Sequence, residues 1–378
     1  MSDRRVVLFA GGGTGGHLYP ALALADALLE LRPDVEVAFA GAERGIEARV
    51  LPARNVEHFL LPVRGFARGV PIWRNLGVLP ALLQSLATVG AWVHRHRPAA
   101  VVVTGGYAGG PAGLVAAVTG TPLALQEQNA VPGATTRALS RWAAQVHVAY
   151  PEARGHLPPA GRAAVRISGN PIRPPRAIDP VDARRGLGLD PTRPVVLVVG
   201  GSQGSAALNA AMLDAVQRTQ GAAPEYQLLW STGPRHIEAV DAALDREGRP
   251  DWVHAVGYID DMPRALAAAH VAISRAGAMA TSELLAWGVP AILVPLPTAA
   301  AGHQELNAVA LEDAGCAIHA AESDLDGIRL TEALQRLLDD PERLTRMRTA
   351  ALERAQPNAA RDIAREIAGL LPTTRRAA

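Results

Sequence analysis

Three glycine-rich segments carry the clearest chemical signal in this 378-residue sequence. They are Gly11–Gly16, Gly200–Gly204 and Ser274–Gly277, and each follows a short apolar run and precedes a helical pattern. Glycine lets a backbone turn tightly and approach a ligand closely, and the N-terminus of the following helix favours negative charge. Each loop alone is also compatible with an ordinary strand-to-helix turn. Three such loops together predict a phosphate-bearing ligand.

The first loop also fits a second interpretation. Gly11, Gly13 and Gly16 satisfy G-x-G-x-x-G, the fingerprint of dinucleotide-binding folds, with Glu43 as a candidate ribose partner. An NAD-dependent oxidoreductase needs only one such loop, however, and leaves Gly200–Gly204 without a task. The chain contains no lysine, which argues against P-loop nucleotide hydrolysis and excludes Schiff-base chemistry.

Polar side chains near the later loops suit ribose and sugar hydroxyls. Glu283 follows the expected helix start near Ala278, where a carboxylate either binds both ribose hydroxyls or acts as a partner of the helix dipole. The amides of 303–307 suit sugar hydroxyls, with helix capping as the alternative. Asp324 and Asp326 form the only Asp-x-Asp pair, near the start of a late helix, and are interpreted as capping residues.

The elements that must position these groups alternate along the chain. Short runs rich in Val, Ile and Leu predict strands, and longer helical patterns separate them in two successive series. Continuous apolar strands with helices between them indicate parallel sheets covered on both faces, so the expected fold class is α/β with two doubly wound domains. The expected strands lie near 5–10, 35–40, 56–61, 99–104, 122–126, 145–149, 194–200, 226–231, 252–256, 270–274, 290–294 and 316–319.

Three prolines within residues 169–176 predict a linker, because proline disrupts regular structure. The expected organisation is an N-terminal domain over 1–168 and a C-terminal domain over 177–355. A helix and tail over 356–378 are expected to return to the first domain. Sheets of this class bind ligands outside the carboxyl ends of their strands, so the expected site is a cleft between the domains.

Charge divides near the same boundary. The net charge of +1 combines residues 1–170, with 16 arginines and 10 acidic residues (+6), and residues 171–378, with 21 and 26 (−5). A basic half suits phosphates, nucleic acid or an anionic membrane, although uneven solvated charge also produces such an excess. The single cysteine, Cys316, excludes an internal disulfide and fits a reducing compartment. No segment reaches the ~20 apolar residues that span a bilayer.

Eight motifs, in order and at compatible spacings over most of the chain, resemble the peptidoglycan N-acetylglucosaminyltransferase family. They are Gly-Gly-Thr-Gly-Gly-His at 12–17, Gly-Gly-Tyr at 105–107, Glu-Gln-Asn at 127–129, Gly-Asn-Pro-Ile-Arg at 169–173, Gly-Gly-Ser-Gln-Gly at 200–204, Ile-Asp-Asp-Met at 259–262, Ser-Arg-Ala-Gly-Ala at 274–278 and His-Gln-x-x-Asn at 303–307. The resemblance implies a GT-B fold, two Rossmann-like domains facing across a cleft. It also implies transfer of N-acetylglucosamine (GlcNAc) from UDP-GlcNAc to lipid I, the undecaprenyl-diphosphate-linked muramyl pentapeptide, to form lipid II. Inversion at the anomeric carbon without a bound metal or other cofactor is implied as well.

The same resemblance implies roles for individual residues. Asn129 and Gln304 are expected to bind GlcNAc and Glu283 the ribose hydroxyls. Ile259 is expected to bind uracil through its backbone. The remaining expected substrate-binding residues are Thr14, Gly15 and Gly16 on the donor side of the cleft, Tyr107 on the acceptor side, Arg173 and Ser202 at the diphosphate, and Ala278, Met279, Ala280, Thr281 and Ser282 at the phosphate and ribose.

The implied reaction, attack by the 4-hydroxyl of N-acetylmuramic acid (MurNAc) on C1 of GlcNAc, needs a base. His17 is the first candidate, because it lies beside the first glycine loop and imidazole titrates near neutral pH. A structural role in the first helical turn is its alternative, and Glu127 is the second candidate base. Helix dipoles and Arg173 are expected to stabilise charge on the departing UDP.

Two positions depart from the family pattern. Gln126 stands where the family usually has histidine, so no histidine can act there. Ala301 and Gly302 precede His303 where two acidic residues are common. A carboxylate contact from that loop is therefore not expected.

Residues 64–79 mix apolar and cationic side chains and are expected to contact an anionic membrane surface. Apolar side chains would enter the interface while arginines meet lipid phosphates. These residues are Ile72, Trp73, Leu76, Leu79, Arg68 and Arg74. The alternative is that the apolar residues pack on the sheet, but their place in the basic half favours the membrane.

The expected location is therefore peripheral, on the cytoplasmic face of the bacterial inner membrane. The expected partners are UDP-GlcNAc, lipid I and the membrane surface, and no nucleic acid. Two other functions stay open, an NAD-dependent oxidoreductase and a nucleotide-sugar-binding protein without catalysis. In the latter, His17 and Gly105–Tyr107 would have no task.

Overall fold

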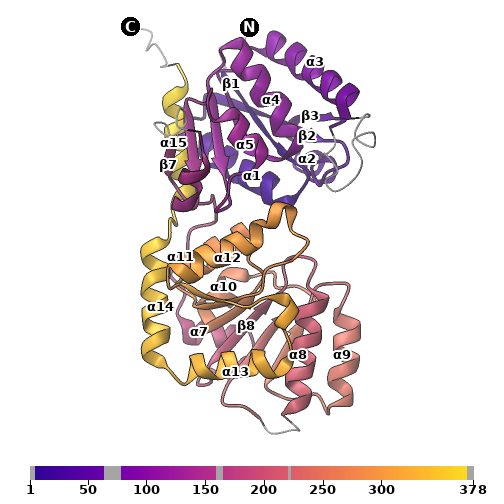
Figure 1. Cartoon of the computed structure of the whole chain (residues 1–378), viewed down its shortest axis with the longest axis vertical. Helices are drawn as coiled ribbons and strands as arrows, with labels where there is room; N and C mark the ends of the chain where they lie inside the picture. The colour runs from indigo at the N-terminus through magenta and orange to yellow at the C-terminus, as the bar shows by residue number, and fades with distance from the viewer. Residues whose placement is uncertain (1–4, 64–77, 159–164, 220–222, 373–378) are drawn as a thin grey trace. The chain divides into compact units, whose positions relative to one another are not determined.

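Two parallel β-sheets, each covered by helices, form the computed structural model, which describes residues 5–63, 78–158, 165–219 and 223–372 (Figure 1). One unit holds the chain up to Arg173 together with the segment from Asn358 onward, and the other holds Pro174–Pro357. The predicted α/β class with two doubly wound sheets is confirmed. Each unit is described by itself below.

The first sheet has the strand order β3-β2-β1-β4-β5-β6-β7. All its pairings are parallel, and the apolar runs that predicted its strands explain why both of its faces are covered. Its strands are β1 (Arg5–Gly12), β2 (Val35–Ala42), β3 (Glu57–Leu61), β4 (Ala100–Gly105), β5 (Leu123–Glu127), β6 (Gln145–Val148) and β7 (Val165–Ile167). The sequence predicted six of these strands and missed β7, a three-residue edge strand with one buried side chain.

Alternate residues of the first sheet enter two separate cores. Leu8 and Val101 belong to one core, and Val7 and Phe9 belong to the other. The helices of this unit are α1 (Gly15–Leu31), α2 (Glu47–Ala53), α3 (Val78–His96), α4 (Gly106–Thr119), α5 (Ala134–Leu139), α15 (Ala359–Leu370) and a 3-10 helix over Pro151–His156. Packing on both faces leaves the loops at the strand ends as the places for ligands.

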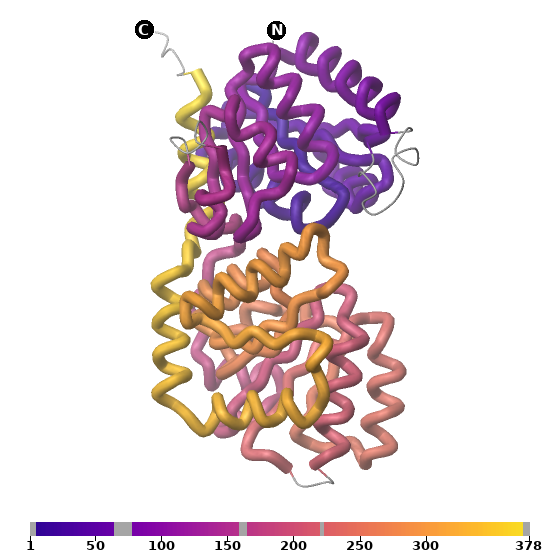
Figure 2. The backbone as a smooth tube through the Cα atoms, in the orientation of Figure 1, coloured from indigo at the N-terminus to yellow at the C-terminus, as the bar shows by residue number. Residues whose placement is uncertain are grey.

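The last helix, α15, completes the first unit. Ile363 and Ile367 are fully buried in the same core as Leu18 and Leu28 of α1. Figures 1 and 2 show this yellow C-terminal helix beside the strands and helices of the N-terminal half. Helix α15, which follows α1 by more than 300 residues in the sequence, therefore covers part of one face of the first sheet together with α1.

The second sheet has the strand order β10-β9-β8-β11-β12-β13, again all parallel. Its strands are β8 (Val195–Val199), β9 (Gln227–Ser231), β10 (Val253–Val256), β11 (Val271–Ser274), β12 (Ala291–Leu293) and β13 (Ala317–His319). Its helices are α7 (Pro180–Gly186), α8 (Ala206–Arg218), α9 (Ile237–Arg246), α10 (Met262–Ala268), α11 (Ala278–Trp287), α12 (His303–Asp313), α13 (Gly327–Leu338) and α14 (Pro341–Arg354), with 3-10 turns over Ala300–Gly302 and Glu322–Asp324. The six strands predicted for this half are confirmed.

Side-chain caps define several helix starts in the second unit. Asp326 accepts a hydrogen bond from the Arg329 amide at 2.8 Å, so its predicted capping role is confirmed. Ser205 caps α8 in the same way. Asp324, for which capping was also predicted, instead ends the preceding 3-10 turn and pairs with the Arg329 side chain at 3.3 Å.

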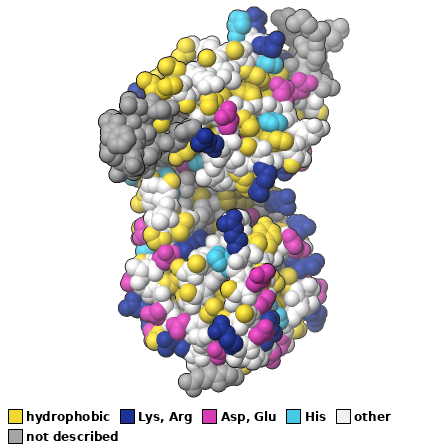
Figure 3. Space-filling view, turned by 90° about the vertical axis from the view of Figure 1, so that its right-hand side faces the viewer, with side chains coloured by type: hydrophobic (Ala, Val, Ile, Leu, Met, Phe, Trp, Pro, Cys, Tyr) yellow, Lys and Arg dark blue, Asp and Glu magenta, His cyan; other side chains and the backbone are white. Residues whose placement is uncertain are grey.

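On the visible face of this unit, arginine and acidic side chains are interspersed (Figure 3). Although residues 171–378 carry a net charge of −5, their acidic side chains do not form one continuous acidic surface on that face.

Candidate functional site

In each sheet, chain order reverses between two neighbouring strands. The reversal lies between β1 and β4 in the first sheet and between β8 and β11 in the second. The loops that leave such neighbouring strands diverge to opposite faces, which opens a crevice at the carboxyl edge of the sheet. The glycine segments Gly11–Gly16, Gly200–Gly204 and Ser274–Gly277 follow three of these four strands.

The loops after β1 and β4 interlock through glycine. Gly13 has a φ of 97° and Gly106 a φ of 74°, values that side-chain-bearing residues rarely adopt. A Cβ on Gly106 would overlap the backbone carbonyl of Gly12. The close approach of two backbones therefore requires these glycines even before any ligand is considered.

His17 lies in the first turn of α1, and both acceptors near its Nδ1 atom are oxygens. Nδ1 is 3.0 Å from the carbonyl oxygen of Thr104 and 3.1 Å from Oε1 of Gln128. A carbonyl oxygen and an amide oxygen can only accept hydrogen bonds. Nδ1 therefore carries the proton in the neutral ring, and Nε2 presents a lone pair. His17 thus has the tautomer that a general base requires.

Buried amides hold the acceptor that faces His17. The Gln128 Nε2 atom donates to the Thr104 carbonyl at 2.8 Å and to Oε1 of Gln126 at 2.5 Å, which fixes its own Oε1 toward the histidine. Gln126 in turn donates to Oδ1 of Asn170 at 3.1 Å. Gln126, the position where the family pattern has histidine, therefore supports His17 indirectly through its amide.

Glu127 is buried and accepts four hydrogen bonds, three from the loop that follows β5 and one from Thr136 of α5. Oε1 accepts from the backbone and side-chain amides of Asn129, both at 3.2 Å. Oε2 accepts from the Gly133 amide at 3.0 Å and from the Thr136 hydroxyl at 2.6 Å. These contacts saturate the carboxylate and hold Asn129, which favours a positioning role over that of a base.

Glu47, which was not predicted from the sequence, holds the first glycine loop through a hydrogen bond to its backbone. Its side chain is fully buried, and Oε1 accepts the Gly13 amide hydrogen at 2.6 Å. Oε2 has no hydrogen-bond partner among the described residues. Burial raises the pKa of the Glu47 carboxyl, against smaller opposite effects from backbone amides and His17. A Cβ on Gly12 would come within 2.5 Å of Oε1, so glycine at this position makes room for the carboxylate.

Two exposed tyrosines flank the same loop. Tyr107, at the start of α4, would lie 3.5 Å from a Cβ on Gly13, and Tyr19 of α1 would lie 3.1 Å from one on Gly15. Both rings are about half exposed. Thr14 and Gly16 are exposed and Gly15 is partly exposed. The predicted residues Thr14, Gly15, Gly16, His17 and Tyr107 therefore gather at one edge of the first sheet, together with the unpredicted Tyr19.

The second unit holds a cavity of about 500 Å³ at its own point of strand reversal. Gly204 has a φ of 76°, and a Cβ on it would overlap the Thr232 carbonyl. Gly277, the N-cap of α11, has an ordinary φ of −68° and no atom within 4 Å of where a Cβ would lie. The cavity is lined by Gly200, Gly201, Gly204, Ser205, Ala206, Ala207, Ser274, Arg275, Gly277, Ala280, Leu296, Gln304 and Glu322.

Arg275 joins the loops around this cavity and was not singled out from the sequence. Its guanidinium donates to the Val294 and Pro295 carbonyls at 3.1 Å and to Ser205 Oγ at 2.6 Å. It also pairs with Glu322. Because it contacts the segments after β12 and β13 and the start of α8, this buried arginine fixes the shape of the cavity.

The structure brings only some predicted second-unit residues into this cavity. Gln304 and Ala280 line it, and Gln304 Oε1 accepts from the Leu296 amide at 2.9 Å. Ala278, Met279, Thr281, Ser282 and Glu283 lie on the first turns of α11, whose N-cap reaches the cavity, but they do not line it. Ser202, exposed in the glycine loop, and Ile259, buried before α10, also lie outside the lining.

Other predicted residues are absent from the lining of the second-unit cavity or lie outside the described chain. Arg173 is exposed and is the last residue of the first unit. Of the expected membrane residues, Leu79 is 62% exposed at the start of α3. Arg68, Ile72, Trp73, Arg74 and Leu76 lie outside the described residues. Among the helices that the structure describes, none combines the length and apolar character needed to cross a bilayer.

Comparisons with known proteins agree over nearly the whole chain. The sequence matches the "Glycosyltransferase family 28 N-terminal domain" over residues 7–148 and the "Glycosyltransferase family 28 C-terminal domain" over 195–367. A Salinibacter ruber protein, named UDP-N-acetylglucosamine--N-acetylmuramyl-(pentapeptide) pyrophosphoryl-undecaprenol N-acetylglucosamine transferase, is 42% identical over 372 residues, 96% of each chain. A Prosthecochloris aestuarii protein of the same name is 40% identical over 368 residues, 96% of this chain and 98% of its own.

Solved structures give the same result. The crystal structure of Acinetobacter baumannii MurG is similar with a TM-score of 0.78 and 29% identity, and the match covers 97% of this chain and 100% of that one. A putative UDP-N-acetylglucosamine 2-epimerase from Listeria monocytogenes has a TM-score of 0.65 at 16% identity over 97% of this chain and 96% of that one. At that identity the second likeness extends to the fold alone.

Proposed function

The chain belongs to glycosyltransferase family 28, and we propose that it transfers GlcNAc from UDP-GlcNAc to the 4-hydroxyl of MurNAc in lipid I, forming lipid II for peptidoglycan. The observation that carries the catalytic part is the pair of oxygens at His17 Nδ1, which leaves Nε2 to accept a proton. A non-catalytic binding protein gives this arrangement no task, and an NAD-dependent oxidoreductase leaves the loop Gly200–Gly204 without one.

In the proposed reaction, the acceptor O4 attacks C1 of GlcNAc. The O4–C1 bond forms as the C1–O bond to the diphosphate breaks, and that electron pair leaves with UDP. The proton of the 4-hydroxyl moves to His17 Nε2. Attack and departure on opposite faces invert the anomeric centre. The Thr104 carbonyl and Gln128 Oε1 both accept from Nδ1 and stabilise the imidazolium that results.

We infer that the cavity of the second unit receives the donor. The N-terminus of α11, capped by Gly277, favours the diphosphate, because its backbone amides point toward that end of the helix. Gln304 supplies an amide for the sugar, and Arg275 holds the surrounding loops. Glu283 on the ribose, Ile259 on uracil, and Ser202 and Arg173 on the diphosphate complete the proposal. Family resemblance supports these four assignments.

We infer that Asn129 binds GlcNAc hydroxyls and that Glu127 positions it. The backbone and side-chain amides of Asn129 both donate to Glu127 Oε1, so the carboxylate fixes the orientation of the side chain that is proposed to bind the sugar. The exposed Tyr107 is proposed to contact the acceptor, and the exposed loop 14–16 beside it is proposed to contact the donor. His17 remains the proposed base.

We propose a peripheral position on the cytoplasmic face of the membrane, where the acceptor's undecaprenyl chain is anchored. The apolar and cationic composition of residues 64–79 and the +6 charge of residues 1–170 support it. Replacing Ile72, Trp73 and Leu76 with serine should weaken sedimentation with anionic vesicles and leave UDP-GlcNAc binding unchanged. Unchanged sedimentation would contradict the assignment.

One assay tests the proposed activity directly. The full chain is incubated with UDP-[¹⁴C]GlcNAc and a short-chain lipid I analogue, and labelled lipid is separated from the donor. Labelled lipid is expected from the wild type, and about 10²–10⁴-fold less from His17→Ala, the usual range for loss of a general base. A protein that binds UDP-GlcNAc but forms no labelled lipid would overturn the enzymatic proposal.

A further inference from the structure

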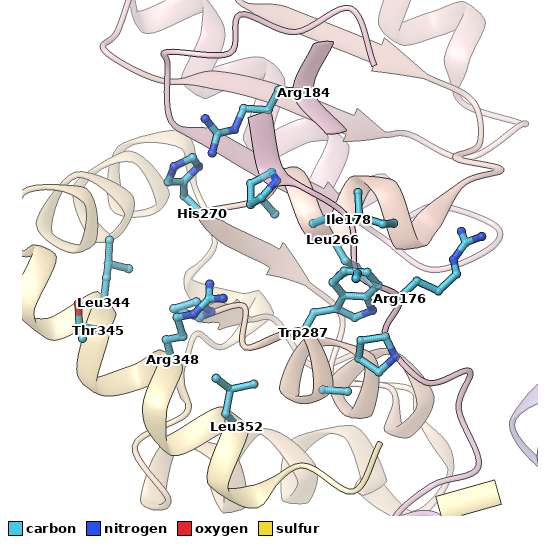
Figure 4. Close-up of a pocket in the computed structure, with 17 residues that line it drawn as sticks. Arg176, Ile178, Arg184, Leu266, His270, Trp287, Leu344, Thr345, Arg348 and Leu352 are labelled. Carbon is cyan, nitrogen blue, oxygen red and sulfur yellow. The ribbon is translucent and has the colours of Figure 1, made fainter. Parts of the chain in front are cut away.

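Figure 4 shows a second cavity in the Pro174–Pro357 unit. It lies at the opposite edge of the sheet from the proposed donor cavity. Its volume is about 450 Å³, within the range of small-molecule sites. His270 and Pro290 in its wall come directly before β11 and β12, whereas the donor cavity is built from residues that follow strands. The two cavities therefore share no lining residue.

The wall of this amino-edge cavity is positively charged. It contains Arg176, Arg184 and Arg348 and no acidic residue. Arg176 is paired with Asp261 at 3.3 Å, but no ion pair is recorded for Arg184 or Arg348 among the described residues. Arg184 donates from Nη1 to the Pro191 carbonyl at 2.5 Å, while its buried Nε has no hydrogen-bond partner in the described chain. Within the described chain, the cavity thus holds two arginines without a paired carboxylate, of which Arg184 is half-buried and Arg348 is exposed.

His270 indicates that these two charges act on the same region. Its Nδ1 accepts the Val195 amide hydrogen at 3.0 Å, so the neutral ring carries its proton on Nε2. Burial, followed by the charges of Arg184 and Arg348, lowers the pKa of His270 to about 4. His270 is therefore a neutral donor at physiological pH, and the arginines alone supply the positive charge.

The remaining wall is apolar. Figure 4 shows Trp287, Ile178 and Leu266 grouped on one side of the cavity, with Arg184 and His270 on another. Leu344 and Leu352 of α14 add to the apolar lining. A matching ligand has an anionic head and an apolar body. Two guanidinium groups suit a dianionic phosphate, because each can donate two hydrogen bonds to phosphate oxygens.

We propose that this amino-edge cavity is a second ligand site for a small soluble phosphate monoester with an apolar body, separate from the donor site. The phosphate would lie between Arg184 and Arg348 with His270 Nε2 as a further donor. The apolar body would contact Trp287. This proposal does not depend on the proposed transferase activity, because it rests on a different cavity.

Calorimetric titration of the full chain with hexyl phosphate tests the proposal, with saturating UDP present to occupy the donor cavity. Saturable binding at one site is expected. Hexyl phosphate should bind more tightly than ethyl phosphate, by up to about fourfold for each added methylene that is buried, and inorganic phosphate should bind most weakly. Equal affinities for the three, or no binding in the presence of UDP, would overturn the proposal.

Matched arginine variants locate the site. Arg348→Gln and Arg184→Gln should each weaken hexyl phosphate binding about tenfold, the usual effect of losing a charge-assisted hydrogen bond. The controls are Arg346→Gln on the same helix as Arg348 and Arg185→Gln beside Arg184, because neither control residue lines the cavity. Equal losses in the variants and their controls would contradict the assignment.

Sedimentation with vesicles distinguishes binding of a small soluble phosphate from binding of a lipid surface. Vesicles of phosphatidylcholine with phosphatidic acid present the same phosphate monoester in a bilayer. Hexyl phosphate binding that Arg348→Gln abolishes while vesicle sedimentation stays unchanged supports a small-molecule site. Sedimentation that depends on Arg348, without measurable hexyl phosphate binding, would overturn it in favour of a membrane contact.

Discussion

Glu47 Oε1 accepts the amide hydrogen of Gly13 at 2.6 Å and so ties α2 to the tip of the glycine loop that precedes His17. Gly13 has a φ of 97°, a conformation that the loop must maintain for α1 to begin at Gly15. A buried carboxyl group therefore fixes a backbone segment proposed to contact substrate. The first prediction follows from this bond.

Glu47→Gln should keep most activity, because the amide oxygen can still accept from Gly13. Glu47→Ala leaves the Gly13 amide without this acceptor and should lower the free energy of unfolding by about 1–3 kcal/mol. It should also raise the KM for UDP-GlcNAc more than the KM for the lipid acceptor, because Gly13 leads directly into the donor-side residues Thr14, Gly15 and Gly16. Denaturant unfolding and initial rates measure both effects. Equal activity of the two variants would contradict this role.

His17 and Gln128 should be coupled in the pH dependence of transfer. Gln128→Met removes the acceptor that faces Nδ1, which destabilises the imidazolium and should shift the acidic limb of the kcat profile to lower pH. We expect kcat to fall about tenfold at neutral pH, within the net range of one hydrogen bond to a charged group. The KM for UDP-GlcNAc serves as the control. An unshifted acidic limb would show that Nδ1 does not act through Gln128.

Glu127 should behave as a positioning residue. Glu127→Gln disturbs the bonds to Asn129, Gly133 and Thr136, and it should raise the KM for UDP-GlcNAc while the acidic limb of the pH profile remains. Thr136→Val removes one bond to Oε2 only and should show a smaller change of the same kind. A loss confined to kcat, with the acidic limb gone, would instead identify Glu127 as the base.

Alanine substitution at two glycines of the second unit should have different effects on the free energy of unfolding. Gly204→Ala should destabilise the fold, because φ is 76° and the Cβ would overlap the Thr232 carbonyl. Gly277→Ala should leave the unfolding free energy nearly unchanged, since its φ is −68° and the Cβ meets no atom within 4 Å. Gly277→Ala should nevertheless weaken UDP-GlcNAc binding, measured by calorimetry. Unchanged donor affinity would place the diphosphate elsewhere.

Stability should fall in mild acid through buried histidines. His147 is fully buried, and burial, followed by Arg166, lowers its pKa to about 4. Protons therefore bind the unfolded chain first, so the contribution of His147 is present above pH ~6.5 and is lost toward pH ~4, at up to about 1.4 kcal/mol per pH unit. Unfolding midpoints of the wild type should fall over this range more than those of His147→Asn. Exposed His94→Asn is the control and should follow the wild type.

Most of the fold could be predicted because its strands are continuous apolar runs. Twelve of the thirteen strands that the structure describes lie where the runs predicted them. β7 was missed because Val165–Ile167 has only three residues, and one of them is buried. A short edge strand pairs along one side alone, so its sequence carries no extended apolar run.

Less of the candidate site could be predicted, because local sequence patterns do not show which distant segments come into contact. The glycine loops and His17 have local signatures: Gly11–Gly16 and His17 lie at one edge of the first sheet, and the other two loops lie at one edge of the second. Glu47 and Arg275 act by filling spaces between segments distant in sequence, so no spacing singled them out. The acceptors around Glu127, which argue against its role as a base, likewise emerge only in three dimensions.

The place of α15 in the core of the first unit also bears on how the chain is made. Residues from Asn358 onward complete a unit whose other residues end at Arg173. During synthesis, the 174–357 unit has its full sequence before the first unit does. Until Ile363 and Ile367 leave the ribosome, the apolar surface of α1 that they cover stays open. A nascent chain therefore exposes the apolar surface of α1 until the α15 segment has emerged, and a chaperone that shields α1 would help it most.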